Sequence, residues 1–219
     1  MRIIKIIVKK IFMVVITLLG IGVLLFFIQT ILLVGSGGCA KKPVIYLYPQ
    51  VQQEVFVEVN YDGEFTCTYP EYKEGWKVTA DPDGTLLNHK DQKEYSYLYW
   101  EGIDNYKWDL STGFVIKGEE TAEFLQEKLA YLGLTPREYN EFIVYWLPEM
   151  QNNEYNLIHF ATKEYEELAQ LKISPTPDTI LRVFMVYKPL DRYQEIEEQV
   201  LETTKRDGFT VVEWGGTKK

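Results

Sequence analysis

The chain has 219 residues, with 23 lysines and arginines against 32 aspartates and glutamates, a net charge of −9. The first 40 residues hold four of the cations and no acid, so the remainder has 19 cations against 32 acids, a net −13. Such a surface repels nucleic acids and anionic lipid headgroups, and it excludes DNA and RNA as expected partners. Residues 43–219 are enough for one domain with its own core.

An apolar run occupies residues 11–34 and follows a basic segment, residues 1–10. A helix over this run would be ~36 Å long, enough to cross a hydrocarbon core of ~30 Å. The apolar part of a cleaved signal peptide is usually only about 7–15 residues, which favours an uncleaved transmembrane anchor. Four cations precede the run, and only Lys41 and Lys42 follow it closely. This excess predicts a cytoplasmic N-terminus, with the C-terminal domain outside the cell membrane.

A short glycine-rich linker, residues 35–42, joins the apolar run to the domain and contains Cys39. The second cysteine is Cys67, and both lie beyond the run, where disulfides persist. We expect a Cys39–Cys67 disulfide, which would close a loop of about 28 residues worth roughly 3–4 kcal/mol. The alternative is lipidation of Cys39. The two glycines before it fit a lipoprotein cleavage site, whereas Ser36 stands where Leu or Val is usual. A third reading is two free thiols.

Residues 43–118 read as a β-rich sub-domain. A β-branched and aromatic run from 44 to 48 predicts the first strand, which Pro49 ends. Asp62-Gly63 is typical of a hairpin between the flanking strands 54–61 and 64–69. Residues 75–89 predict a second hairpin with its turn at Pro82 to Gly84, and residues 94–102 a further strand.

Residues 119–219 read as an α+β sub-domain. Leucines at helical spacing predict a helix that Gly133 ends. Thr135, Pro136 and Glu138 then begin a second helix with a capping box. We expect this helix to be short, because residues 142–148 read as a strand. Further elements are expected as strands at 156–162, 180–189 and 209–216 and a short helix at 163–172. The predicted fold class is therefore α+β, mainly antiparallel, behind a single transmembrane helix.

The segments KPVIYLYP (42–49), TCTYPEY (66–72), YLYWEG (97–102), EFIVYWLP (141–148) and VEWGG (212–216) form a recognisable set. Together they resemble an uncharacterised family of exported or membrane-anchored bacterial proteins with a KPVIYLYP opening and a VEWGG close. The resemblance implies an extracytoplasmic domain and assigns no activity or ligand. Residues 195–207 are more acidic and more helix-like than the resemblance leads us to expect.

Residues with catalytic potential are few. His89 and His159 lack ligand spacing, and two cysteines without a nearby histidine do not predict zinc, so we expect no metal and no cofactor. Glu101 and Glu213 each lie beside a tryptophan near a glycine. An acid beside an indole can act as a general acid with a second carboxylate as its partner, as in glycosidases. An envelope glycan hydrolase using this pair is therefore the alternative hypothesis, and two exposed strand-end acids are the plainer one.

Aromatic residues make up 15% of the chain. Trp100 and Trp214, with Tyr99, lie near strand ends beside glycine turns, where rings can form an exposed rim. Such a rim suits a peptide or a carbohydrate, although cross-strand aromatic pairs also simply hold small sheets together. Our leading expectation is a non-catalytic binding or assembly module, anchored in the membrane, with an envelope peptide, glycan or protein as partner.

Overall fold

The computed structural model describes residues 20, 22 and 38–219. The predicted basic segment 1–10 and, apart from Gly20 and Gly22, the apolar run 11–34 lie outside the described residues. Within the part of the chain that is described, no helix has both the length and the apolar character needed to cross a bilayer. Residues 38–219 form one compact unit.

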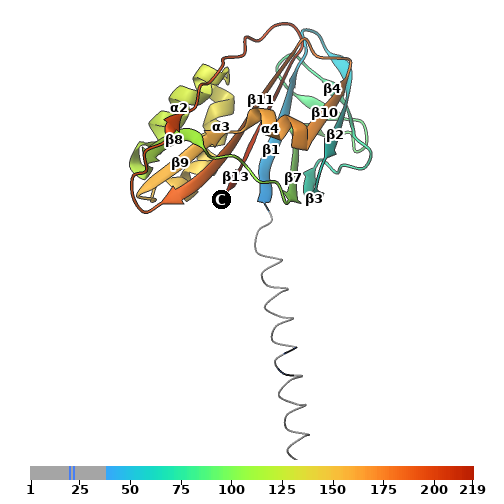
Figure 1. The fold of residues 1–219 in the computed structure, drawn as a ribbon. Coiled ribbons are helices and arrows are strands. Elements are labelled where there is room, and N and C mark those ends of the chain that lie inside the picture. The colour runs from blue at the N-terminus through green and yellow to red at the C-terminus, as the bar shows by residue number, and fades with distance from the viewer. Residues whose placement is uncertain (1–19, 21, 23–37) are drawn as a thin grey trace, which may run out of the picture. The chain divides into compact units, whose positions relative to one another are not determined.

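A large sheet of eight strands runs through the middle of this unit (Figure 1). Its neighbouring strands are antiparallel, except that β11 runs parallel to β13 and β12 parallel to β8. In spatial order the strands are β12 (Glu197–Glu198), β8 (Thr112–Lys117), β9 (Tyr155–Phe160), β11 (Thr179–Leu190), β13 (Thr210–Lys218), β1 (Gly38–Tyr48), β7 (Leu98–Asp104) and β3 (Glu64–Tyr69).

A smaller sheet and two helices cover the two faces of the large sheet (Figure 1). The small sheet is antiparallel, in the order β10 (Ala169–Ser174), β2 (Gln53–Tyr61), β4 (Trp76–Ala80), β5 (Leu86–Asn88) and β6 (Glu94–Tyr95). The helices are α2 (Thr121–Leu132), preceded by the 3-10 turn η1 (Gly118–Glu120), and α3 (Pro136–Met150). A short helix, α4 (Thr162–Leu168), leads into β10.

Two separate hydrophobic cores result, because successive residues of a strand point to opposite faces. On β1, Val44 and Tyr46 enter the helix-side core beneath α2 and α3. Ile45 and Leu47 enter the sheet-side core between the two sheets. Both faces of the central strands are therefore buried.

Most predicted elements are confirmed, and the α+β, mainly antiparallel class is correct. The β4–β5 hairpin forms, Gly133 ends α2 with φ 107°, and Thr135 and Glu138 make the capping box of α3. The structure adds three strands that the sequence reading missed, β8, β10 and β12. The helix predicted at 163–172 ends at Leu168, because residues 169–172 belong to β10. The linker also ends earlier than predicted, because β1 begins at Gly38.

The predicted strand 142–148 is wrong, because these residues continue α3 as far as Met150. Phe142, Trp146 and Met150 recur at intervals of four residues and are all fully buried. This helical periodicity outweighs the β-branched and aromatic composition of the segment. Pro148 is tolerated close to the C-terminal end of the helix.

The hairpin predicted at Asp62-Gly63 is also wrong. Strands form on both sides of it, but β2 joins the small sheet and β3 joins the large one. The two segments read as sub-domains, 43–118 and 119–219, share one sheet. Strands β1, β3 and β7 come from the first segment and β9, β11 and β13 from the second, and all six belong to the large sheet.

A connecting segment, residues 191–209, links β11 to β13 and contains only the two-residue strand β12. It has no helix, although its composition is helix-like. Side-chain contacts fix it to the helices. Tyr131 donates a hydrogen bond to the carbonyl of Leu201 at 3.4 Å, and Arg206 donates to the carbonyl of Gly133 at 3.0 Å and pairs with Glu138.

Candidate functional site

A groove of about 460 Å³ lies where the end of β9, the first turn of α4 and the connecting segment meet. His159 comes from β9, Glu164 from α4 and Arg182 from β11, while Gln199 and Val200 come from the connecting segment. His159 and Glu164 are only five residues apart, whereas Arg182 and Gln199 come from later segments of the chain. The sheet order brings them together, since β9 and β11 are neighbours.

The wall formed by the connecting segment is held by one amide side chain. Gln199 accepts a hydrogen bond from the backbone N–H of Phe160 at 2.9 Å and donates one to the carbonyl of the same residue at 2.8 Å. It therefore pairs with β9 as a neighbouring strand would. Because both backbone groups of Phe160 are satisfied, the groove wall has a defined position.

His159 faces the groove with its orientation fixed. Its Nδ1 lies 2.8 Å from the carbonyl oxygen of Thr112. A carbonyl oxygen can only accept, so Nδ1 carries a proton, and Nε2 is the nitrogen directed to Glu164, 3.7 Å from Oε2. Glu164 also accepts from the backbone N–H of Asp109 at 3.2 Å. The pair presents one imidazole nitrogen beside a carboxylate.

The floor of the groove is an ion pair between adjacent strands. Arg182 on β11 stands directly opposite Glu213 on β13 in the parallel register. The Nε atom and the Nη2 atom of Arg182 each lie 2.6 Å from Glu213 Oε2. The other carboxylate oxygen accepts from Tyr165 Oη at 3.0 Å and from Trp100 Nε1 at 3.2 Å. Glu213 is fully buried, and Arg182 is 8% exposed.

Electrostatics and stacking both hold this guanidinium in place. Burial lowers the pKa of Arg182, but the adjacent Glu213 carboxylate outweighs it and the pKa is raised overall. The guanidinium carbon lies 4.4 Å from the centre of the Tyr165 ring, which stacks on Phe184 at 4.1 Å. Burial and the Glu213 carboxylate raise the pKa of Tyr165 well above its ordinary value, so it remains a donor.

The predicted aromatic rim is wrong. Trp100 is fully buried in the sheet-side core, and Trp214 is fully buried in the helix-side core. The two rings therefore lie on opposite faces of the large sheet. Tyr99 is half-buried against the helix-side core. Burial and a hydrogen bond to Glu101 raise its pKa.

The predicted carboxylate pair does not form either. Glu213 points into the sheet-side core with Trp100, whereas Glu101 lies beside Tyr99 on the opposite face of the large sheet. Glu101 accepts from the backbone N–H of Lys42 at 3.4 Å. With a folded sheet between them, these two acids cannot act on one substrate bond.

The predicted Cys39–Cys67 disulfide is absent, and Cys67 is a free, exposed cysteine. In register, Cys39 on β1 is opposite Ile103 of β7, and Cys67 on β3 is opposite Glu101 on the other side of β7. Two strand spacings separate them, ~10 Å. A disulfide needs Cα atoms within about 7 Å, so the sheet keeps the cysteines apart. Lipidation of Cys39 stays a prediction.

His89 lies outside the groove, with its Nε2 2.8 Å from Thr79 Oγ1. Among the described residues, no group of three or more histidine, cysteine or acidic side chains is placed to hold a metal ion.

The residues that sequence reasoning missed are Arg182, Gln199 and Glu164. One signal was available: Arg182 and Glu213 are single charges inside otherwise apolar strands, and opposite charges in buried strands favour pairing. The contributions of Gln199 and Glu164 depend on tertiary contacts alone. Comparisons with protein-family models, curated proteins and solved structures found no match.

Proposed function

We propose that the chain is a membrane-anchored binding module on the outer face of the cell membrane, and that its groove holds a cationic peptide segment of an envelope protein. The anchor and its orientation rest on the apolar run 11–34 and the four cations before it. The ligand class rests on the groove. We place the module among proteins that bind their partner without transforming it.

The charge of the groove carries this proposal. Its lining includes the acids Glu164, Glu166 and Glu202 and the cations Lys163 and Arg182. Glu213 compensates Arg182 from below, so the lining that faces a ligand is negative. A lysine or arginine entering the groove would meet these carboxylates, and complementary charge of this kind sets partner choice and association rate.

The lip of the groove supplies the apolar part of such an interface. Val200 is 88% exposed and borders the groove together with the half-buried Leu201. An exposed aliphatic side chain beside fixed polar groups offers an extended peptide an apolar contact next to its charged one. The preferred ligand therefore combines a basic residue with an aliphatic one.

Titration of the full chain with short basic, neutral and acidic peptides tests the ligand class. We expect binding by the basic peptides only, with Glu164→Gln and Glu202→Gln each weakening it by about 2–5-fold, the range of a partly screened ion pair. Glu195→Gln, on the same segment but outside the groove lining, serves as the matched control. Equal binding of all three peptide classes, or unchanged affinity in both groove variants, would contradict the proposal.

The orientation has its own test, because Cys67 is exposed. In a Cys39→Ser background, a membrane-impermeant thiol reagent should label Cys67 in intact cells. Labelling that appears only after lysis would place the domain in the cytoplasm. The hydrolase alternative has no support of this kind, since its two carboxylates lie on opposite faces of the sheet.

A further inference from the structure

A cluster of lysines lies at one edge of the domain, where central strands of the large sheet begin or end. β13 ends at this edge beside the start of β1 and the end of β11, with Lys41 opposite Gly216 and Tyr187 opposite Lys218. We call this cluster the basic edge. It consists of Lys41, Lys42, Lys188, Lys218 and Lys219.

Three of these lysines have no acidic partner. Lys188, Lys218 and Lys219 are exposed, and none is within ion-pair distance of a side-chain carboxylate in the described chain. Lys218 lies over the Tyr187 ring at 5.9 Å, and Lys219 donates to a backbone carbonyl at 3.5 Å. These contacts leave the positive charge facing outward.

The other two lysines are partly engaged. Lys41 lies 3.8 Å from Glu149. Lys42 lies 4.7 Å from the centre of the Tyr145 ring and 5.5 Å from that of Trp214. Glu101 accepts from the backbone N–H of Lys42 at 3.4 Å, and Glu141 interacts electrostatically with the Lys42 ammonium. The basic edge therefore has five cations against three nearby acids. The exposed acids Asp62, Glu64, Glu154 and Asp191 lie on its flanks.

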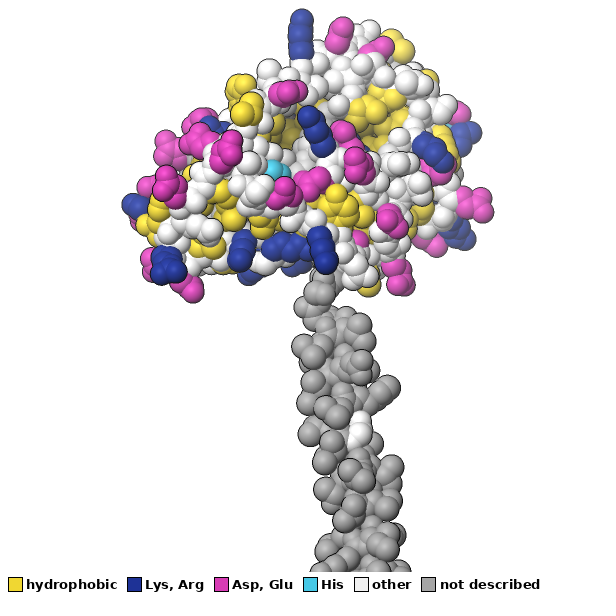
Figure 2. Space-filling model, viewed as in Figure 1, with side chains coloured by type: hydrophobic (Ala, Val, Ile, Leu, Met, Phe, Trp, Pro, Cys, Tyr) yellow, Lys and Arg dark blue, Asp and Glu magenta, His cyan; other side chains and the backbone are white. Residues whose placement is uncertain are grey.

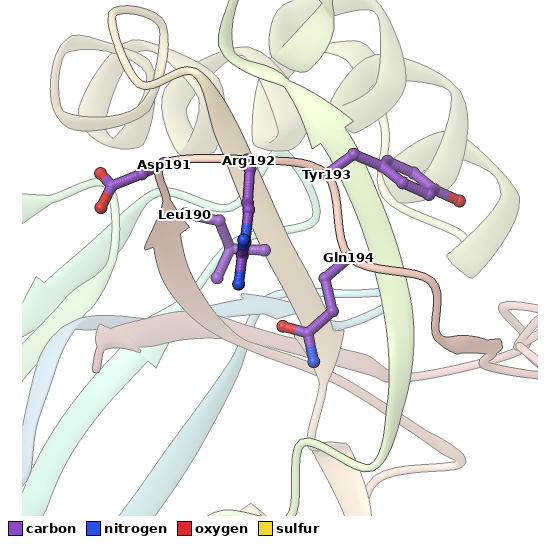
Figure 3. Close-up of a pocket in the computed structure, with 5 residues that line it drawn as sticks. All are labelled: Leu190, Asp191, Arg192, Tyr193 and Gln194. Carbon is purple, nitrogen blue, oxygen red and sulfur yellow. The ribbon is translucent and has the colours of Figure 1, made fainter.

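The loop after β11 extends the basic edge. It encloses an open hollow lined by residues 190–194. Figure 3 shows Arg192 and Gln194 extending to one side of the loop backbone, whereas Asp191 and Tyr193 point away from it. In Figure 2 several lysine and arginine side chains form a row along the lower border of the domain, with acids at both ends of the row, and further lysines, arginines and acids are scattered over the rest of the visible face.

Because these lysines are gathered at one edge, the net charge of the domain does not describe how that edge interacts with another surface. Charges farther apart than a Debye length, about 8 Å at physiological salt, are largely screened from one another. An approaching surface therefore responds to the basic edge and not to the −13 of the whole domain. The net charge therefore does not determine how this edge meets anionic headgroups.

We propose that the basic edge rests on the anionic phospholipid headgroups of the membrane that holds the chain. β1 begins at this edge with Gly38, so the apolar run is bonded to the domain here through residues 35–37 alone. So short a connection keeps the lysines within reach of the headgroups. The proposal rests on the anchoring part of the proposed function.

The test uses the full chain in lipid nanodiscs made of phosphatidylcholine alone or with phosphatidylglycerol. A fluorophore is attached at Tyr193→Cys, an exposed site in the loop beside the edge, with both native cysteines changed to serine. A quencher is carried by the lipid headgroups. We expect quenching at least two-fold stronger in the anionic discs, with the difference lost at high salt, as for lysines held at an anionic surface.

Two double variants make the comparison specific. Lys188→Glu/Lys218→Glu should abolish the difference between the discs. Lys73→Glu/Lys205→Glu makes the same charge change in segments remote from the basic edge and should retain it. Circular dichroism confirms that both variants fold. Loss of the difference in both variants, or in neither, would overturn the proposal.

The outcomes also distinguish failure of the headgroup contact from failure of the membrane anchor. A chain that enters both discs and is quenched equally in them retains its anchor and refutes the basic edge as a headgroup contact. A chain that enters neither disc refutes the anchor and this proposal with it. A fluorescence change with soluble polyphosphate but not with phosphatidylglycerol would assign the edge to a soluble polyanion instead.

Discussion

Replacing Glu213 by glutamine should destabilise the domain strongly. The carboxylate is fully buried and faces an arginine that is only 8% exposed. Glutamine keeps the size of the side chain and an acceptor for Tyr165 and Trp100, but it removes the charge that compensates Arg182. Removing one partner of a buried ion pair typically costs about 3–5 kcal/mol. That is a large part of the 5–15 kcal/mol expected for a whole domain.

The double variant Arg182→Met/Glu213→Gln isolates the cause. Here no uncompensated charge remains, and a methionine fills the space along the Tyr165 ring. We expect the double variant to recover more than half of the loss, because an apolar replacement of a buried pair is often neutral. The coupling between the two sites should therefore be at least about 1.5 kcal/mol, which a double-mutant cycle measures.

Urea unfolding followed by tryptophan fluorescence suits this measurement, since Trp76, Trp100, Trp146 and Trp214 are all buried. Equal slopes of the unfolding curves would show that the variants change stability rather than compactness. A loss below about 1 kcal/mol for the single variant, or simple additivity in the double variant, would refute the reasoning that the pair is buried and coupled.

Three further predictions concern other parts of the domain. Burial raises the pKa of Tyr165 and of Tyr187 above the ordinary value of 10. The contribution of these two side chains to stability is therefore complete below pH ~10 and is lost as the pH rises above it. Alkaline unfolding should coincide with the appearance of phenolate absorbance. Gly133→Ala should cost about 1–2 kcal/mol in thermal unfolding, because φ is 107° and the added Cβ would lie 2.7 Å from Leu181 Cδ1. An unchanged midpoint would contradict that geometry. Cys67 should react fully with a thiol reagent when no reductant is present. Resistance to labelling would support the Cys39–Cys67 disulfide instead.

The sequence predicted an element correctly where neighbouring residues alone determine its structure. Gly133, Thr135 and Glu138 determine how α2 ends and α3 begins within a few residues, so the sequence located that boundary correctly. The segment 142–148 failed because its β-branched and aromatic composition was weighed without the four-residue repeat that begins at Glu138. The first member of the repeat is Glu138, which is fully buried although its side chain is charged, so the sequence did not indicate it as a core position.

The pairing of strands and the candidate site were not predictable in this way. Asp62-Gly63 is a favourable turn, but β2 pairs with β4 and with β10, which lies more than a hundred residues later, and not with β3. The aromatic rim failed for a related reason. Alternation along a strand separates inside from outside only when one face is solvated, and here both faces of the central strands carry a core. Trp100 and Trp214 therefore resembled surface rings while lying in the interior.

The position of β13 governs when the domain can fold. This strand is formed by residues 210–218, yet it lies at the centre of the large sheet between β1 and β11. One edge of β1 therefore stays unpaired until nearly the whole chain has been synthesised. Sheets closed by such distant segments fold slowly, and their unpaired edges attract other chains meanwhile. A chain truncated after residue 209 should stay sensitive to protease even though every helix is present.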